Sequence, residues 1–324
     1  MKRSTTVAGA ALLYVCLVYP FFLVADAALR FYGGTASGGT HEFDLVKIDP
    51  SNGNTTLAVE GKIWTGMDLA PDGRTLYAVS NKLYTIDIAA GTYREIGPLA
   101  FQGSIPLLMV SMTIAPDGQM YAIGKSYIAP GSADLFLYRI DKATGNLEYL
   151  GTPDLSVWAI EFAPDGTLYG ALYDLMVLDP KDGSTLQTIG PLDSGVKIYE
   201  LDCSEAGNLY GTSDHSLYQI NRTTGQATLL TSYSGGHEVW SLVTKSRPTL
   251  HITSVQGAPP GIRWESDTSE TYRVSVSADL VAWILASGDL PGSGTGVNSW
   301  ADDGLHALGP PSGARLRFYK VELF

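Results

Sequence analysis

A short phrase built on Ala-Pro-Asp-Gly and ending in an apolar-Tyr-small segment recurs along the chain. It stands at residues 70–78, 115–122 and 163–170, and in weaker form at 204–211. A second phrase, of the type Leu-Tyr-x-Ile-Asp closed by a Gly-containing turn, accompanies it at residues 45–53, 83–91, 137–145, 178–183 and 217–225. Self-similarity at a fixed period restricts a chain to the repeat architectures.

The tyrosine of the first phrase measures the period. It falls at Tyr32, Tyr77, Tyr121, Tyr169 and Tyr210, so the intervals run from 41 to 48 residues. Pro-Asp-Gly and Thr-Gly are turn sequences, because Pro presets φ, Asp caps the turn and Gly accepts a positive φ. The segments between them alternate apolar and polar residues with the period of strands. Each copy therefore predicts a four-stranded antiparallel meander, and five copies predict an all-β chain with a five-bladed β-propeller.

The two ends of the repeat region are incomplete in complementary ways. Residues 30–34 match the second strand of a copy, with no first strand before them. Residues 238–243 match a first strand, with no later strands after them. We expect these two segments to share one blade and so to close the ring, which removes the exposed sheet edges of an open array.

The period stops after Arg247, and residues 28–247 form the predicted propeller. Residues 248–324 contain short strand-like segments around 262–264, 272–277, 283–285 and 316–321, separated by stretches rich in Gly, Pro, Ser and Asp. They predict a small β-sandwich at the C-terminus. Four aromatic residues are expected in its core, at Trp264, Tyr272, Trp283 and Phe318.

Residues 1–27 have the plan of a secretory signal peptide. Two basic residues precede an apolar run at 7–24, and Ala25-Asp26-Ala27 supplies a small-x-small cleavage site. The alternative is an uncleaved membrane anchor, against which Pro20 and the cleavage site argue. The sequence predicts a protein that is secreted, periplasmic or held at the cell surface, without stable membrane insertion after cleavage.

Charge excludes one class of partner. The chain has a formal charge of −12 and a pI near 4.8, whereas nucleic-acid binding needs clustered Lys and Arg. After cleavage the mature chain keeps Cys203 alone. One thiol can form neither an intramolecular disulfide nor a zinc cluster, and we expect Cys203 to be a small buried residue.

The repeated phrases resemble those of secreted bacterial propellers of the NHL-like and lactonase-like superfamily. This resemblance implies the propeller fold and leaves the function open, because the fold carries enzymes, receptors and scaffolds. The tail resembles a small β-sandwich module at the C-termini of exported bacterial proteins. That module reads Trp, then Tyr-x-Val-x-x-Ser-x-Asp-Leu-x-x-Trp, then Arg-Phe-Tyr-x-Val, here Trp264, residues 272–283 and residues 317–321.

Aligning the first strands on the Pro-Asp-Gly turn places acidic residues at one repeated position. Asp68, Glu161 and Asp202 share it with Thr113 and Val243, and Glu200 lies two residues before Asp202 on the same strand face. First strands line the channel of a propeller, so these carboxylates are candidates for a Ca²⁺ site or a general acid/base pair. Alternatively, each side chain bonds the backbone of the neighbouring blade. No other cofactor is expected.

Two functions are consistent with these observations. The first is an exported, non-catalytic scaffold that binds a protein or glycan partner through the propeller loops and the sandwich. The second is a propeller hydrolase, lactonase-like or acting on glycans, that uses the channel carboxylates. A lactonase-like set would also need an Asn that the alignment does not supply.

Overall fold

A computed structural model describes residues 29–36, 43–73, 75–88, 90–101, 107–125, 135–153, 157–193, 195–245, 254–256, 261–265, 271–278, 282–293, 297–302 and 318–323. The chain divides into two compact units, Leu29–Ser246 and a second that includes Arg247–Phe324. The predicted signal peptide, residues 1–27, lies outside the described residues. Within the ranges given, no helix has the length and apolar character needed to cross a membrane.

The first unit is built from sheets whose strands follow one another along the chain, and we number these sheets as blades. Blade 1 contains β1 (Arg30–Thr35), β2 (Leu45–Ile48), β3 (Thr55–Val59) and, from the far end of the repeats, β21 (Val239–Lys245). Blade 2 contains β4 (Gly66–Leu69), β5 (Leu76–Val79), β6 (Lys82–Asp87) and β7 (Thr92–Pro98). Blade 3 contains β9 (Met109–Ile114), β10 (Met120–Lys125), β11 (Leu135–Ile140) and β12 (Asn146–Gly151), with β8 (Ala100–Phe101) parallel to β12.

The last two blades repeat the same order. Blade 4 contains β13 (Ala159–Phe162), β14 (Leu168–Ala171), β15 (Asp174–Leu178) and β16 (Thr185–Pro191). Blade 5 contains β17 (Glu200–Cys203), β18 (Leu209–Ser213), β19 (Ser216–Ile220) and β20 (Ala227–Ser232), and a short 3-10 turn, η2 (Ser234–Gly236), leads from it to β21. Apart from β8, neighbouring strands within these blades are antiparallel. The all-β propeller class predicted from the repeats is confirmed.

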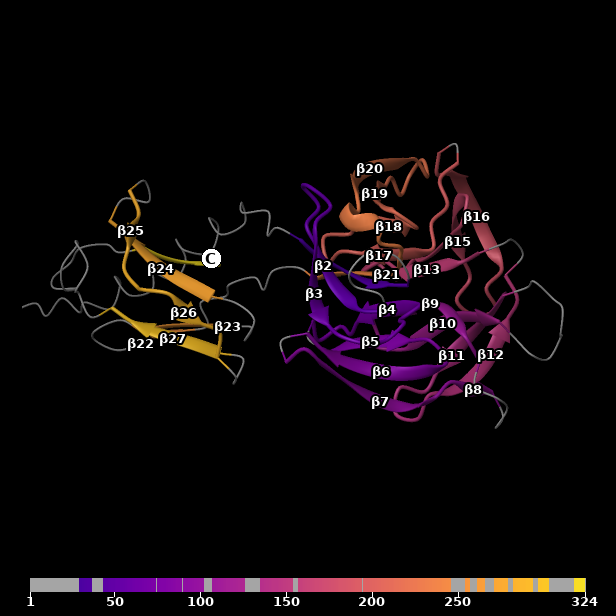
Figure 1. The fold of residues 1–324 in the computed structure, drawn as a ribbon, viewed down its shortest axis with the longest axis horizontal. Helices are drawn as coiled ribbons and strands as arrows, with labels where there is room; N and C mark the ends of the chain where they lie inside the picture. Colours follow the sequence, from indigo (N-terminus) through magenta and orange to yellow (C-terminus); the bar gives the residue numbers. More distant parts are fainter. Residues whose placement is uncertain are drawn as a thin grey trace, which may run out of the picture. The chain divides into compact units, whose positions relative to one another are not determined.

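The first strand of each blade lies toward the middle of the ring, and the last strand lies at its rim (Figure 1). Successive first strands contact one another in the cyclic order β21, β4, β9, β13, β17 and back to β21. A residue at one fixed position of the repeat therefore recurs around a common axis. This arrangement brings residues together that lie far apart in the sequence.

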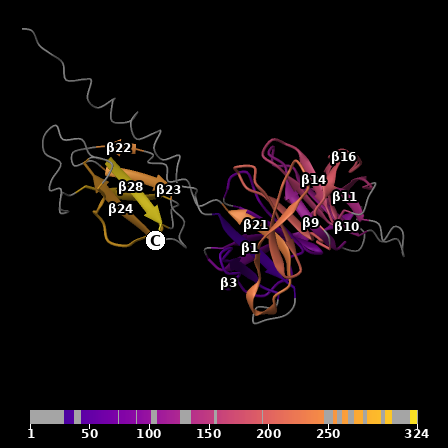
Figure 2. The same ribbon diagram turned by 90° about the horizontal axis from the view of Figure 1, so that it is seen from above.

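The ring closes through blade 1, where β21 and β1 lie side by side (Figure 2). The register pairs Phe31 with Thr244 and Gly33 with Leu242. The incomplete ends of the repeat region thus combine into one sheet, as the sequence predicts. Ser241 adds a link to blade 2, because its hydroxyl donates to the carbonyl of Trp64 at 2.8 Å.

The core of the propeller lies between neighbouring blades. Each pair of adjacent blades shares one cluster of buried side chains; Ile160 and Leu168 of blade 4, for example, pack with Ile123 and Leu137 of blade 3. The repeated apolar positions of the strands supply these clusters, so burial of apolar surface holds the ring together without disulfides.

The repeated turns have the conformations that their sequences predict. In the three Pro-Asp-Gly turns and the corresponding turn of the weaker copy at 204–211, Gly73, Gly118, Gly166 and Gly207 all have positive φ. In the second type of turn, the Asp or Asn side chain accepts a backbone N–H two or three residues later, as for Asp49, Asp87, Asp141, Asp179 and Asn221. These Asp and Asn residues cap the turns of the second phrase.

The second unit contains two small sheets. One contains β22 (Ser254–Gln256), β23 (Gly261–Glu265) and β27 (Val297–Ala301), and the other contains β24 (Thr271–Ser277), β25 (Ile284–Leu285), β26 (Leu290–Pro291) and β28 (Phe318–Leu323). Trp264 and Tyr272 are fully buried in one core, as predicted. The prediction is wrong for Trp283, which is half-buried because it stands just outside the two-residue strand β25. The side chain of Phe318 lies outside the described set.

Candidate metal centre

The five residues aligned on the Pro-Asp-Gly turn all lie on first strands. Asp68 is on β4, Thr113 on β9, Glu161 on β13, Asp202 on β17 and Val243 on β21. We call this set the carboxylate ring. Its members occupy one level because each strand enters the same turn after the same number of residues. The sequence alignment therefore predicted which side chains share a level.

Each polar member of the carboxylate ring bonds the next blade. Asp68 Oδ2 accepts the N–H of Ile114 at 2.6 Å, and Thr113 Oγ1 accepts the N–H of Phe162 at 2.9 Å. Glu161 Oε1 accepts the N–H of Cys203 at 3.2 Å, and Asp202 Oδ2 accepts the hydroxyl of Thr244. The donor is in every case the residue that follows the ring member of the next blade. The inter-blade alternative weighed for these residues therefore accounts for one oxygen of each carboxylate.

The fifth position breaks this pattern, because Val243 has no acceptor. The matching donor, the N–H of Leu69, instead bonds Oδ1 of Asp68 at 2.6 Å. Asp68 therefore receives two backbone N–H groups, and the hydroxyl of Thr113 lies 3.3 Å from its Oδ2. Two strong donors favour the charged form of this carboxylate.

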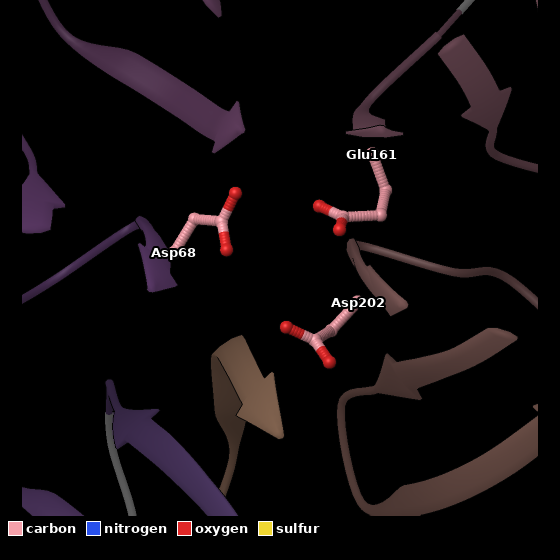
Figure 3. A group of neighbouring side chains, drawn as sticks. All are labelled: Asp68, Glu161 and Asp202. Carbon is pink, nitrogen blue, oxygen red and sulfur yellow. The ribbon is translucent and has the colours of Figure 1, made fainter. Parts of the chain in front are cut away.

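The three carboxylate groups of the ring face one another. Asp68, Glu161 and Asp202 come from three blades and point into a common space (Figure 3). One oxygen from each lies within 4.8 Å of the others. The three residues are only 7%, 3% and 3% exposed. Oε2 of Glu161 is buried and has no hydrogen-bond partner among the described residues.

Burial and mutual repulsion raise the pKa values of this group. Loss of solvation and the charge of Asp202 raise the pKa of Asp68 well above its usual value, and the N–H groups of Ile114 and Leu69 oppose the rise. Burial, followed by the charges of Asp68 and Asp202, raises the pKa of Glu161 well above its usual value. Burial raises the pKa of Asp202 to about 7, against the opposing effect of Thr244. The three groups together must retain protons or bind a cation near neutral pH.

Glu200, the fourth candidate, does not join the three. It lies at the start of β17, two residues before Asp202, where the other first strands carry Gly66, Ser111, Ala159 and Ser241. Glu200 is fully buried, and neither of its carboxylate oxygens meets a hydrogen-bond partner among the described residues. Burial raises its pKa well above the usual value, although Ser111 and the N–H of Met112 lie close enough to favour the charged form.

The arrangement suits a hard cation. Ca²⁺ takes carboxylate oxygens at roughly 2.3–2.6 Å, so two oxygens that bind one ion lie at most about 5 Å apart. The three oxygens from Asp68, Glu161 and Asp202 lie within 4.8 Å of one another and so satisfy this condition. The carboxylates of Asp68, Glu161 and Asp202 would supply three ligands, and water would complete the shell.

Sequence reasoning missed two features of the surroundings. One is Thr244, whose hydroxyl bonds Asp202 and ties blade 5 to the closing strand; its place directly after the aligned Val243 is the signal that identifies it. The other is Arg222, which binds across two blades. Cys203 is half-buried, less than the full burial expected from the sequence, and burial raises the pKa of its thiol to about 12, so the thiol is protonated near neutral pH.

No family model and no curated protein matches this chain. Solved structures that resemble it include a gluconolactonase from Xanthomonas campestris, with a TM-score of 0.44, 14% identity and coverage of 63% of this chain and 78% of that one. A regucalcin from Agrobacterium tumefaciens, described as a calcium-binding protein, has a TM-score of 0.44 and 15% identity, and the match covers 74% of this chain and 86% of that one. A chain of a nidogen/laminin complex has a TM-score of 0.45 and 8% identity, and the match covers 67% of this chain and 98% of that one. Similarity at this level supports no statement about the ligand or activity of this chain.

Proposed function

We propose that the propeller is an exported Ca²⁺-binding scaffold. Asp68, Glu161 and Asp202 hold one Ca²⁺ in the channel, and the ion joins blades 2, 4 and 5. The observation that supports this most directly is the convergence of three buried carboxylate oxygens within 4.8 Å. Oε2 of Glu161, buried and without a partner among the described residues, adds a ligand atom that needs a positive charge.

A cation in this place has a structural effect. Without it, three like charges repel one another across blades that only packing and backbone contacts hold together. With it, each charged oxygen gains an attractive partner in surroundings that screen charge weakly. Extracellular Ca²⁺ modules bind with Kd values of roughly 10⁻⁴ to 10⁻³ M. An exported propeller meets Ca²⁺ in this range, and the ion then stabilises the ring on which a protein or glycan partner docks.

Calorimetry at pH 8 tests this proposal with Ca²⁺ as the titrant. Glu161→Gln is the informative variant, because its amide oxygen still accepts the N–H of Cys203 while the negative charge is lost. At a Ca²⁺ concentration about ten times Kd, the wild-type Tm should rise by roughly 3–6 °C, and that of Glu161→Gln should not respond. Glu205→Gln removes one exposed charge from a turn of blade 5 and serves as control. A wild type whose Tm is indifferent to Ca²⁺ contradicts the proposal.

The hydrolase remains a second candidate, because the same three carboxylates are the only acidic set that the described residues bring together for chemistry. It requires a substrate to reach side chains that are 3–7% exposed. Assays with a lactone series and an aryl-glycoside series, with and without Ca²⁺, separate the two functions. Turnover by the wild type that Glu161→Gln abolishes would establish the enzyme; the scaffold proposal expects no turnover.

Export completes the proposal. The support is the sequence of residues 1–27, and the mature chain is expected to begin at Ala28. Expression with the native N-terminus in a bacterial host, followed by mass spectrometry of the culture medium and periplasm, tests it. A protein that keeps Met1 and stays in the cytoplasm would contradict export and leave the cation site untouched.

A further inference from the structure

Glu200 is a buried carboxyl group that the carboxylate ring leaves unused. It is fully buried, and both of its oxygens lack a hydrogen-bond partner among the described residues. A buried carboxyl group with two unsatisfied oxygens costs stability unless something binds them. Asp202, two residues later on β17, has a partner of its own in Thr244. Glu200 therefore marks a second place in the channel that needs an occupant.

Glu200 belongs to the next level of the channel, farther from the Pro-Asp-Gly turns than the carboxylate ring. We call this set the Glu200 level; its members are Gly66, Ser111, Ala159, Glu200 and Ser241. All five are buried. All the first strands that supply them are among the described residues. The members of the carboxylate ring, by contrast, keep 3–7% exposure at their three acidic positions.

The side chain of Glu200 does not make the bond that its position favours. At the same level of blade 3, the Oγ of Ser111 accepts the N–H of Ile160 in blade 4 at 3.0 Å. Glu200 would likewise accept the N–H of Leu242 in blade 1, yet it does not. Burial raises the pKa of Glu200, and the nearby Ser111 and the N–H of Met112, both on β9 of blade 3, oppose the rise. Blade 4 lies between blades 3 and 5, so the side chain of Glu200 reaches across the channel.

Gly66 leaves the space that this side chain enters. A Cβ placed on Gly66 would lie 2.6 Å from the backbone nitrogen of Met112 and 2.8 Å from the carbonyl carbon of Ser111. A side chain on blade 2 would therefore occupy the approach to the N–H of Met112. The other members of the level are small as well. The carboxyl group of Glu200 is thus the only long side chain of the level.

The distance between the two levels is suited to one water molecule. Two residues of strand separate the levels by roughly 6.6 Å. Glu200 lies outside the group of three carboxylates within 4.8 Å, which point into a common space (Figure 3). Ca²⁺ binds oxygens at roughly 2.3–2.6 Å, and a water on the ion reaches an acceptor about 5 Å from the ion. Glu200 is therefore too deep to bind an ion in the ring directly and close enough to bind a water on it.

We propose that Glu200 is an indirect ligand of the channel cation, and that it accepts a hydrogen bond from a water molecule on the inner side of the ion. This inference rests on the proposed Ca²⁺ site and adds a fourth carboxyl group to it. The burial of the whole Glu200 level encloses the water, which then satisfies oxygens that otherwise have no partner. Groups that orient the ligands of a metal change its affinity by roughly 10–100-fold.

Titration calorimetry of the full chain with CaCl₂ at pH 8 tests this inference with two variants. Glu200→Leu has a similar volume and no acceptor, and its Kd for Ca²⁺ should rise at least about tenfold. Glu200→Gln keeps one acceptor oxygen, and its loss of affinity should be clearly smaller. Glu205→Gln serves again as control and should leave the Kd unchanged. Equal Kd values for the wild type and Glu200→Leu, or equal losses in the Leu and Gln variants, would overturn the inference and leave the Ca²⁺ site itself in place.

Stability without the ion separates this role from a purely structural one. Glu200→Leu replaces an unsatisfied buried carboxyl group by an apolar side chain, so its Tm in the presence of a chelator should equal or exceed that of the wild type. A structural carboxylate would instead lower this Tm when removed, and a fall of more than about 5 °C would overturn the inference.

The structure of the loaded site gives the last readout. Crystals grown with CaCl₂ should show a water between the ion and Glu200 in the wild type, and this water should be missing in Glu200→Leu. An oxygen of Glu200 within 2.6 Å of the ion would make it a direct ligand and contradict the inference. A wild type that binds no Ca²⁺ in calorimetry or in the crystal would overturn the proposed function and this inference together.

Discussion

The carboxylates of Asp68, Glu161 and Asp202 each serve two purposes. One oxygen of each accepts a donor from the next blade and helps to hold the ring, and the three groups also point together into the channel. A polar but uncharged side chain would satisfy the first purpose, as Thr113 does at the same level of blade 3. The negative charges in the channel therefore need a reason of their own, and the proposed cation would supply it.

The cation-free protein should lose stability as pH rises from about 4.5 to 8. The folded-state pKa values of the channel carboxylates lie above the unfolded values. Their contribution is therefore complete below the unfolded pKa, near 4, and is lost as pH rises through about 7 for Asp202.

Urea denaturation in the presence of a chelator measures this dependence. Saturating Ca²⁺ should reduce the loss at pH 8, because the ion binds the deprotonated carboxylates, and should have little effect at pH 4.5. Glu161→Gln should show a shallower decline without any metal. A cation-free stability that stays flat or rises between pH 5 and 8 would refute this account of the carboxylates.

Neighbouring blades pack closely where a glycine turn meets an outer strand. Gly225 has φ of +82°, and a Cβ there would lie 2.4 Å from the carbonyl oxygen of Gly190 in the blade before it. Gly166 has nearly the same φ, +84°, with nothing within 4 Å of such a Cβ. The first glycine is needed for its conformation and for close packing, and the second for its conformation alone.

Replacement of each by alanine should separate these two effects. Gly166→Ala should cost about 1 kcal/mol of unfolding free energy, from the strained φ alone. Gly225→Ala should cost at least about 2 kcal/mol more, since blade 4 must move away from blade 5 to admit the methyl group. Chemical denaturation followed by circular dichroism gives both values, and equal costs would show that the blades do not pack through this turn.

Strand β21 is the element on which closure depends. It pairs with β1, and its residues Val239, Leu242 and Val243 are almost fully buried. A fragment of residues 28–236, which lacks it, should lose the cooperative unfolding that a fragment of residues 28–247 retains, because both the first sheet and the ring are left open. If the two fragments unfold at the same urea concentration, closure through β21 contributes nothing to stability.

The repeat pattern determined most of what could be predicted about the propeller. Turn sequence sets where each strand begins, so the alignment on Pro-Asp-Gly predicted that Asp68, Glu161 and Asp202 share a level. It did not predict that the carboxylate of Glu200 is buried with no hydrogen-bond partner among the described residues, because such contacts depend on how the neighbouring strands pack.

The propeller as a whole combines two kinds of feature around one axis. Apolar clusters between blades supply stability of an ordinary kind, and the channel places buried charge where several blades meet. A charge-free channel would satisfy folding alone. The central claim is therefore that the channel of this propeller is a cation site.

Diffraction from crystals grown at pH 8 with about 10 mM CaCl₂, well above the Kd of extracellular modules, tests this claim most directly. An anomalous difference map at long wavelength should show one peak, roughly 2.3–2.6 Å from an oxygen of each of Asp68, Glu161 and Asp202. The peak should be missing in crystals of Glu161→Gln grown in the same way. A wild-type channel without a peak, in which these carboxylates instead share protons at hydrogen-bond distance, would contradict the account.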